Sequence, residues 1–250
     1  MGSNRSAKAI RATTTPWLSA GPMTIAVIIP TYNRLELTQN CLASIARHDP
    51  VDEVIVVDNG STDGTERLAT HSLKINTGFA TACNIGARHA TADHLIFLNN
   101  DTIVHPNWTS MTRHLEEPDV GIVGPKLIYP DCRIQSAGVA VDFNRPPGLE
   151  AWNLTVDWSA DAIDVDAITG ACLAIRSEVF WQLGGFDTGY WNGYEDVDLC
   201  LASIAKGLRN VYDPKATVTH LESQSGPERW TGLTENVIRL RTKWSLHGNH

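Results

Sequence analysis

Apolar and polar positions alternate regularly along the first half of the chain. Short runs rich in apolar and β-branched residues occur at 24–30, 53–58, 73–75 and 94–98. A polar or glycine-containing loop and then a helical stretch follow each run, and the first helical stretch shows helical spacing at Leu35, Thr38, Leu42 and Ile45. This alternation predicts an α/β fold with a mainly parallel sheet and helices on both faces.

The second half of the chain is less regular. Its pattern predicts extended segments at 121–129 and 133–143, a strand at 172–176, and helices at 177–183, 195–207 and 227–246. Residues 1–22 show no sustained periodicity and are expected to be a disordered leader or the remnant of a tag. The expected domain therefore spans residues 23–250.

The composition favours one elaborated domain. With 250 residues, of which 42% are hydrophobic, the chain can bury one substantial core. Its 28 acidic residues against 20 lysines and arginines give a net charge of −8, which argues against a nucleic-acid partner because such binding needs a basic face. A single nucleotide is compatible with this charge, since a bound cation can supply positive charge.

The cysteines and the apolar runs bear on where the protein acts. Its five cysteines are widely spaced and odd in number, which indicates neither a disulfide framework nor a paired metal motif and favours the reducing cytoplasm. No apolar run reaches the roughly 20 residues that span a bilayer, and residues 1–22 lack the apolar core of a secretory signal. Any membrane association is expected to be peripheral, at the inner face.

Polar loops after the predicted strands carry the candidate chemistry. The carboxyl ends of parallel strands meet at one edge, so PTYNR, DNGSTDGT, NTGFA and NNDT are expected to converge on one crevice. Asp58 ends the second strand, where its carboxylate can accept hydrogen bonds from a nucleobase or a ribose. An alternative is equally compatible with the motif: Asp58, Ser61 and Asp63 only cap a turn and the next helix.

A second group of polar residues follows the apolar strand LIFL. This strand delivers Asn99, Asn100 and Asp101 to the same edge. A hard divalent cation prefers carboxylate oxygen and keeps phosphate oxygens of a substrate in its shell, so one aspartate suffices if a diphosphate completes the coordination. An Asx-rich turn before Pro106 explains the polarity of this segment, but not an acid placed after so apolar a strand.

The segment GGFDTGYWNGYEDVDLC combines acidic and aromatic residues. Glu195 and Asp196 lie in the first turn of a predicted helix, where the helix dipole stabilises negative charge, and this is the ordinary structural reason for acids there. Directly upstream, Tyr190, Trp191 and Tyr194 are suited to stacking against sugar rings. The combination indicates a substrate pocket.

Histidines are further candidate metal ligands. Most of the nine, including His48, His71, His89 and His114, fall in helical or linking segments and are expected to be surface or core residues. His220 differs because it ends the apolar strand ATVTH and precedes the polar loop ESQSG. It therefore also arrives at a strand end.

Together these motifs resemble those of the family 2 glycosyltransferases. VIIPTYNR, VVDNGSTDGT, NTGFATACNIGA, LIFLNNDT, ITGACLAIRSEVFWQLGGFD and NGYEDVDLCLA occur in the order of that family, over about residues 24–222. The NND form and the segment HLESQS are most similar to bacterial rhamnosyltransferase-like members that build cell-surface polysaccharides. The resemblance implies a GT-A fold, with a Rossmann-like, mainly parallel central sheet flanked by helices and a smaller mixed region on the acceptor side.

The resemblance also implies residue roles, with a nucleotide-binding half at about 23–118 and an acceptor-binding half at about 119–225. The residues that match donor-binding positions are Pro30, Thr31, Tyr32, Asn33, Asp58, Asn76, Gly78, Phe79, Asn99, Asn100, Thr169 and Gly170. Those implied on the acceptor side are Trp191, Asn192, Tyr194 and Glu195. Asp196 matches the catalytic base, with Glu195 beside it. Asn99 replaces the first acid of the family's DxD signature, which shifts metal binding onto Asp101, the diphosphate and His220.

The implied reaction is an inverting sugar transfer that needs Mg²⁺ or Mn²⁺. Asp196 would take the proton of an acceptor hydroxyl, which attacks the anomeric carbon, while the metal at Asp101 stabilises the departing diphosphate. The resemblance favours dTDP-rhamnose or a UDP-sugar as donor and a glycan or lipid-linked glycan as acceptor.

Other classes of protein fit less well. A nicotinamide-dependent dehydrogenase should carry a glycine-rich turn after the first strand, where this chain has PTYNRLEL. A non-catalytic carbohydrate- or nucleotide-binding module on a degenerate transferase scaffold is the remaining alternative, motivated by the altered NND motif. The presence of both Asp101 and Asp196 counts against it.

Overall fold

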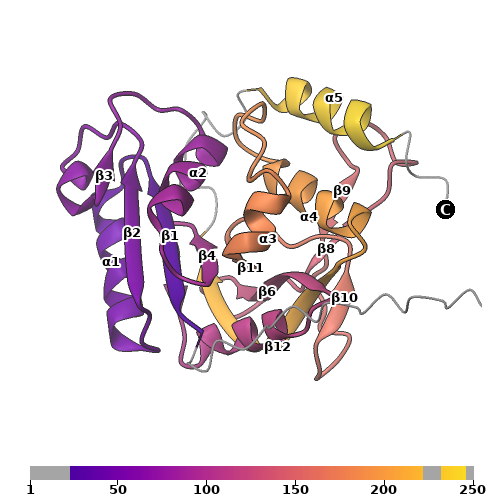
Figure 1. Cartoon of the computed structure of the whole chain (residues 1–250), viewed down its shortest axis with the longest axis horizontal. Helices are drawn as coiled ribbons and strands as arrows, with labels where there is room; N and C mark the ends of the chain where they lie inside the picture. Colours follow the sequence, from indigo (N-terminus) through magenta and orange to yellow (C-terminus); the bar gives the residue numbers. More distant parts are fainter. Residues whose placement is uncertain (1–22, 222–231, 246–250) are drawn as a thin grey trace, which may run out of the picture.

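One sheet runs through the described part of the protein. The computed structural model describes residues 23–221 and 232–245, which form a ten-stranded sheet with the main order β10-β12-β6-β11-β4-β1-β2-β3. Figure 1 shows these strands across the molecule, with β3 and β2 near one edge and β10 near the other. Strands up to β4 build one part of the sheet, and the later strands build the other.

The first part of the sheet is parallel. Its strands are β1 (Ile25–Thr31), β2 (Glu53–Asp58), β3 (His71–Ser72) and β4 (His94–Leu98). Strand β1 lies between β2 and β4 and is parallel to both. Helix α1 (Leu35–Arg47) connects β1 to β2, and α2 (Phe79–His89) precedes β4. The loops that follow β1, β2 and β4 therefore emerge at one edge, as the sequence predicts.

The second part of the sheet is mixed. Its strands are β5 (Thr102–Val104), β6 (Val120–Ile128), β7 (Ile134–Ser136), β10 (Ile163–Val165), β11 (Cys172–Arg176) and β12 (Arg209–His220). Strand β11 is antiparallel to both β4 and β6 and so joins the two parts. Strand β12 is parallel to β6 and antiparallel to β5, and the second pairing sets His220 opposite Thr102.

Smaller elements cover this sheet. A two-stranded sheet is formed by β8 (Val139–Val141) and β9 (Ala151–Asn153), and the later helices are α3 (Ser177–Gln182), α4 (Glu195–Ala205) and α5 (Leu233–Trp244). Two 3-10 helices are η1 (Thr65–Leu68) and η2 (Trp108–Glu116). Asp198 of α4 accepts hydrogen bonds from Lys243 and Trp244 of α5, both at 2.7 Å, so the last helix is tied to α4.

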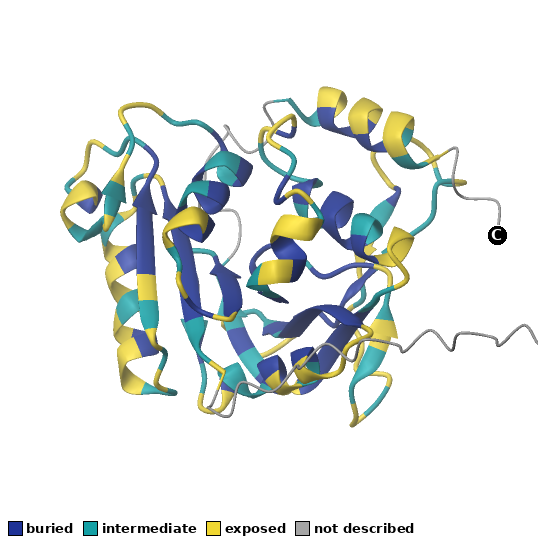
Figure 2. Ribbon diagram, in the orientation of Figure 1, coloured by how far each residue is buried: buried dark blue, intermediate teal, exposed yellow. Residues whose placement is uncertain are grey.

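Alternate residues of the central strands face two separate apolar cores. In β1, Ala26 and Ile28 belong to the core that contains α2, whereas Val27 and Ile29 belong to the core that contains α1 and η2. Gly86 allows α2 to approach the sheet closely, since a Cβ atom there would lie only 2.4 Å from Cγ2 of Ile28. Figure 2 shows buried central strands and exposed outer faces on α1 and α5. Packing on both faces of the sheet thus holds the ends of these strands in place.

Three expectations from the sequence differ from the structure. The run 73–75 is not a strand, because β3 ends before it, at the point where its partner β2 also ends. The segment 133–143 is broken into β7 and β8 by Gly138, whose φ of 94° turns the chain. The helical stretches expected after β2 and β4 are the 3-10 helices η1 and η2.

Both ends of the chain are described only in part. The helix predicted at 227–246 is α5, which begins at Leu233, and residues 227–231 and 246 lie outside the described residues. The leader predicted at 1–22 also lies outside them. Within the described ranges, no helix is both long and apolar enough to cross a bilayer.

Candidate active site

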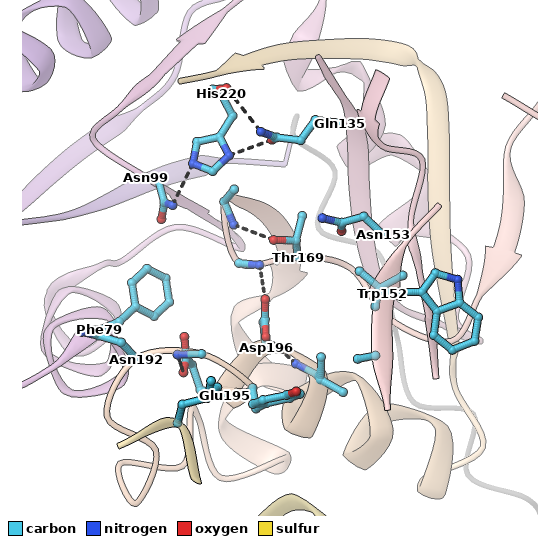
Figure 3. Close-up of a pocket in the computed structure, with 18 of the residues that line it drawn as sticks. Phe79, Asn99, Gln135, Trp152, Asn153, Thr169, Asn192, Glu195, Asp196 and His220 are labelled. Carbon is cyan, nitrogen blue, oxygen red and sulfur yellow. Dashed lines mark hydrogen bonds between the residues drawn. The ribbon is translucent and has the colours of Figure 1, made fainter. Parts of the chain in front are cut away.

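Two adjoining cavities open where β1, β2 and β4 end. They share four lining residues: Phe79, Asn99, Asp101 and Asn192. The smaller cavity, of about 130 Å³, is also lined by Pro30, Thr31, Tyr32, Arg34, Asn59, Asn76 and Asn100. The larger one, of about 420 Å³ (Figure 3), is also lined by residues that include Gln135, Asn153, Thr169, Gly170, Tyr194, Glu195, Asp196 and His220. Most of the predicted site residues therefore meet in one joined space.

A network of hydroxyl and amide groups fixes Asn100 in the smaller cavity. Its Nδ2 donates to the hydroxyl oxygens of Thr31 and Thr38, each at 3.0 Å, and the two hydroxyl groups are 3.0 Å apart. Both amide hydrogens are then used within the protein. The carbonyl oxygen of Asn100 remains as the group that can accept a hydrogen bond from a ligand hydroxyl.

Asn59 is a site residue that the sequence interpretation missed. Its Nδ2 donates to Oδ1 of Asn76 at 2.9 Å and to the carbonyl oxygen of Gly78 at 3.1 Å, and its Oδ1 accepts from the N–H of Thr77 at 2.8 Å. This buried amide therefore holds the turn that begins α2. The motif points instead to its neighbour Asp58, because a carboxylate can accept hydrogen bonds from a nucleobase or a ribose.

Four predicted residues lie outside the linings of both cavities: Asn33, Asp58, Gly78 and Trp191. The carboxylate of Asp58 is buried and accepts the N–H of Ser61 at 3.2 Å, so it caps a turn. Gly78 has a φ of 83°, and a Cβ atom there would lie 2.7 Å from the carbonyl oxygen of Trp191. Asp58 and Gly78 therefore have structural contacts of their own in this structure.

Asp101 and His220 lie together at the junction of the two cavities. Oδ1 of Asp101 is 3.2 Å from Nε2 of His220, and Nδ2 of Asn99 is 3.4 Å from the same nitrogen. The pairing of β12 with β5 causes this proximity, and the N–H of Leu221 donates to the carbonyl oxygen of Asp101 at 3.0 Å. Two residues more than a hundred positions apart thus present oxygen and nitrogen to one point.

This pair suits a divalent cation. Neighbouring ligands of an octahedral ion with bonds of about 2.1 Å lie about 3 Å apart, close to the observed separation of Asp101 and His220. No cluster of three or more His, Cys, Asp or Glu side chains able to hold a metal occurs among the described residues. An ion bound at this pair would therefore need further ligands, such as substrate phosphate and water.

The acid pair Glu195 and Asp196 begins α4 and lines the larger cavity. Oδ2 of Asp196 accepts the N–H of Gly170 at 2.6 Å, and its Oδ1 accepts the N–H of Val197 at 2.8 Å. Oε2 of Glu195 accepts the N–H of Gly193 at 2.7 Å. Each carboxylate is held by backbone donors, so both are oriented before a ligand enters (Figure 3).

Burial raises the pKa values of both acids. Burial raises the pKa of Glu195 to about 8, and the neighbouring charge of Asp196 raises it further. Burial also raises the pKa of Asp196, against the hydrogen bonds from Gly170 and Val197. A carboxylate with a raised pKa that faces a cavity is a suitable general base.

The expected aromatic wall is only partly present. Of the three aromatic residues before α4, Tyr194 lines the larger cavity. Tyr190 is 2% exposed, and its hydroxyl donates to Asp198 at 3.1 Å, so it belongs to the core between α4 and α5. The side chain of Trp191 lies near Gly232, which precedes α5. Its ring also lies near Gly78, which precedes α2, so neither Tyr190 nor Trp191 lines the larger cavity.

Two lining residues from the irregular second half were also missed. Gln135 of β7 contacts His220, and Asn153 of β9 faces the cavity, whereas the indole of the adjacent Trp152 turns away from it (Figure 3). Neither residue belongs to a recognisable motif. The extended pattern around Gln135 indicates a strand, but not which side chains reach the site.

Comparison with known proteins identifies the family. Residues 26–184 match the family model described as "Glycosyl transferase family 2". The chain is 31% identical over 229 residues to the O-antigen biosynthesis protein RfbC of Myxococcus xanthus, a match that covers 82% of this chain and 18% of that protein. It is 28% identical over 239 residues to the N-acetylglucosaminyl-diphospho-decaprenol L-rhamnosyltransferase of Mycobacterium tuberculosis, covering 80% of this chain and 76% of that enzyme.

Solved structures agree with this assignment at the level of fold. The crystal structure of GalNAc-T7 with UDP, GalNAc and Mn²⁺ has a TM-score of 0.75 and 18% identity, and the match covers 90% of this chain and 49% of that one. The chain spans only 28% and 18% of the length of two of the curated relatives that it matches. Because the family match covers more than half of the chain and agrees with its motifs and fold, the protein belongs to glycosyl transferase family 2 and has the GT-A fold.

Proposed function

We propose that this chain transfers a sugar from a nucleoside diphosphate to a hydroxyl group of a glycan or lipid-linked glycan, with inversion at the anomeric carbon. One observation carries the proposal: the two cavities meet at Asp101 and Asn192, with Asp196 in the larger one. A donor that enters from the smaller cavity places its diphosphate beside Asp101. Its sugar then extends toward Asp196.

The smaller cavity is the proposed nucleoside site. Pro30, Thr31 and Tyr32 line one wall, and the fixed amide of Asn100 presents its carbonyl oxygen for a ribose hydroxyl. Asn59 and Asn76 shape the opposite wall through their mutual hydrogen bond. The rhamnosyltransferase relative supports dTDP-rhamnose as donor, with a UDP-sugar as the other candidate.

Asp101 and His220 are the proposed metal-binding residues. Their 3.2 Å separation and the open junction suit Mn²⁺ or Mg²⁺, and the imidazole tilts the choice toward Mn²⁺. A solved neighbour contains UDP and Mn²⁺ together. When bound, the ion supplies Lewis-acid stabilisation of the departing diphosphate.

Asp196 is the proposed general base, and Glu195 orients the acceptor. The acceptor hydroxyl gives its proton to a carboxylate oxygen of Asp196 while its oxygen forms a bond to the anomeric carbon. The bond from that carbon to the diphosphate oxygen breaks, and the diphosphate leaves with the electron pair. Because attack and departure occur on opposite faces of the sugar, the product is inverted.

The acceptor is proposed to bind in the larger cavity. Asn192, Tyr194 and Asn153 line this cavity and offer polar contacts to a sugar. The relatives that act in O-antigen biosynthesis and on a lipid-linked sugar support a role in cell-surface polysaccharide synthesis. In this scheme, residues 23–118 bind the nucleotide and residues 119–225 bind the acceptor.

A donor screen tests the proposed reaction. Wild-type protein is incubated with nucleotide sugars and candidate acceptors, and release of nucleoside diphosphate is measured with Mn²⁺, with Mg²⁺ and with excess chelator. We expect release that chelator abolishes and that added Mn²⁺ restores. Persistent turnover in excess chelator would remove the metal from the scheme, and donor binding without any turnover would favour the non-catalytic binding module.

Asp196→Asn is the matched variant for this screen. It preserves the size of the side chain and its acceptor oxygen toward Gly170, but it cannot take a proton. We expect donor affinity close to wild type and transfer at least about a hundredfold slower, the lower end of general-base effects. Turnover near the wild-type rate would exclude Asp196 as the base.

A further inference from the structure

Gln135 binds His220 at two points. Its Oε1 is 2.8 Å from Nδ1 of the imidazole, and its Nε2 donates to the carbonyl oxygen of His220 at 3.5 Å (Figure 3). Gln135 is 3% exposed, so this amide is buried in the wall of the larger cavity. A buried amide is stable only when its polar groups are paired, and both of its ends meet the same residue.

The strand pairing explains why these two side chains meet. Ile128 at the end of β6 pairs with Thr219 of β12 and with Ile134 of β7. Gln135 and His220 follow those two residues, and Gln135 falls at the register shift between the pairs Ile128–Ile134 and Leu127–Ser136. The contact therefore joins the two strands that pair with the end of β6.

The contacts define the protonation of the imidazole. A carbonyl oxygen accepts only, so the main-chain oxygen of His220 requires the NH₂ group of Gln135 on its side and leaves Oε1 facing Nδ1. Nδ1 must then carry the hydrogen. On the other side of the ring, Nε2 lies 3.4 Å from the amide nitrogen of Asn99 and 3.2 Å from Oδ1 of Asp101, so Nε2 is the nitrogen that faces the proposed metal site.

Nε2 and the Oδ1 atom of Asp101 are 3.2 Å apart. When Nδ1 alone carries the hydrogen, both atoms are acceptors and face each other. Two acceptors at this distance are stabilised by a cation that both can bind. A histidine that binds a metal commonly donates its other N–H to a carbonyl or carboxylate, which fixes the ring and raises its affinity as a ligand.

We infer that Gln135 is a positioning residue for metal binding: it holds His220 in the Nδ1–H tautomer with Nε2 directed at the ion beside Asp101. The inference rests on the proposed metal-dependent function and extends it. Gln135 itself touches neither the ion nor the substrate. Its effect is on the metal affinity of His220.

Mn²⁺ binding to the full chain tests this inference, by titration calorimetry or by loss of the electron paramagnetic resonance signal of free Mn²⁺. The variants are Gln135→Leu, which keeps the size but removes both contacts, and Gln135→Glu, which keeps the acceptor for Nδ1–H. Gln182→Leu on the exposed surface of α3 is the matched control. We expect Gln135→Leu to weaken Mn²⁺ binding by about 10- to 100-fold, Gln135→Glu to recover most of the affinity, and the control to match wild type.

A second readout separates positioning from a general loss of structure. Long-range proton–nitrogen NMR spectra of the His220 ring, assigned with a His220→Gln variant, should show the Nδ1–H tautomer in wild type and loss of that preference in Gln135→Leu. Unchanged Mn²⁺ affinity or an unchanged tautomer in Gln135→Leu would overturn the inference.

Asp101→Ala separates a failure of the proposed metal site from a failure of the role proposed for Gln135. If wild type binds Mn²⁺ and Asp101→Ala does not, the metal site stands, and the Gln135 variants alone decide the role of Gln135. If wild type binds neither Mn²⁺ nor Mg²⁺, the proposed metal site and the inference both fail.

Discussion

Glu195 and Asp196 are neighbours in sequence with different surroundings. Glu195 is 5% exposed, and burial next to Asp196 raises its pKa to about 8. At neutral pH it therefore keeps its proton, and repulsion between two adjacent carboxylates is avoided. Asp196 can then carry the negative charge that a base requires.

This arrangement predicts a specific pH dependence of stability. An unfolded glutamate ionises near pH 4.3, whereas folded Glu195 does so near pH 8. Between these values the folded state holds a proton that the unfolded state has lost, so the free energy of unfolding falls as the pH rises. The stabilisation of the folded state by this proton is complete below about pH 4 and is lost by about pH 8. Its size is on the order of a few kcal/mol.

Glu195→Gln should remove this dependence. Glutamine can still accept the N–H of Gly193 but does not titrate. We expect the stability of the variant relative to wild type to increase between pH 5 and about pH 8.5, measured by urea unfolding at each pH. A constant difference across this range would show that Glu195 is ionised throughout.

At this scale the sequence predicts acids better than amides. Asp101 stands out because it follows an apolar strand, whereas Asp196 is singled out by the family resemblance, since an acid at a helix start is ordinary. Asn59 and Gln135 act through hydrogen bonds to residues whose proximity depends on the tertiary fold. Asp58 shows the converse, because its turn-capping contact with Ser61 is local and was one of the two alternatives that the motif allowed.

At the scale of elements, α5 holds the loop that leads to the acid pair. Asn236 of α5 is 1% exposed, and its Oδ1 accepts the N–H of Trp191 at 3.2 Å. Its Nδ2 donates to the carbonyl oxygens of Asn192 at 3.3 Å and Gly193 at 3.0 Å. The N–H of Gly193 in turn binds Glu195, so the position of the acid pair depends on this helix.

Asn236→Ala tests the contribution of α5. The change leaves two carbonyl oxygens of the loop without their donor, and we expect the free energy of unfolding to fall by about 1 to 3 kcal/mol. Small displacements of reacting groups are costly, so kcat/KM for transfer should fall by about tenfold to a hundredfold. Enzyme kinetics well below the unfolding temperature provide the check.

Glu235→Gln is the control for this variant, because its side chain is exposed on the same turn of α5. It should leave kcat/KM unchanged. Transfer by Asn236→Ala at the wild-type rate would mean that the loop keeps its position without the helix.

The elements of the first half were predictable because each strand there is short, apolar and followed by its own loop. The second half was less so. Gly138 divides one extended segment into two strands that enter different sheets, and the 3-10 form of η2 has no signature in the apolar spacing. The brief strand β3 pairs only with the last two residues of β2, a long-range contact that the apolar pattern around Leu73 does not reveal.

At the scale of the whole molecule, the pairing of β4 with β11 brings the two proposed reactive acids together. Asp101 follows β4, and the N–H of Asn99 donates to the carbonyl oxygen of Ala171 at 3.0 Å. The adjacent Gly170 donates to Asp196 at 2.6 Å. The proposed metal site and base are thus connected through four residues, which explains how the parallel and mixed parts of the sheet act as one site.

The sequence predicts this link between Asp101 and Asp196 only in part. The order of the motifs along the chain indicates the GT-A fold and a common crevice at the strand ends. The antiparallel junction between β4 and β11, which sets the distance between the two acids, depends on long-range pairing that no local pattern encodes.

The central claim is a single displacement in the joined cavities with Asp196 as base. The most direct test is the anomeric configuration of the first product, recorded by proton NMR during the reaction with Mn²⁺ and the donor found in the screen. We expect a product whose configuration is opposite to that of the donor sugar. A product with retained configuration would contradict it.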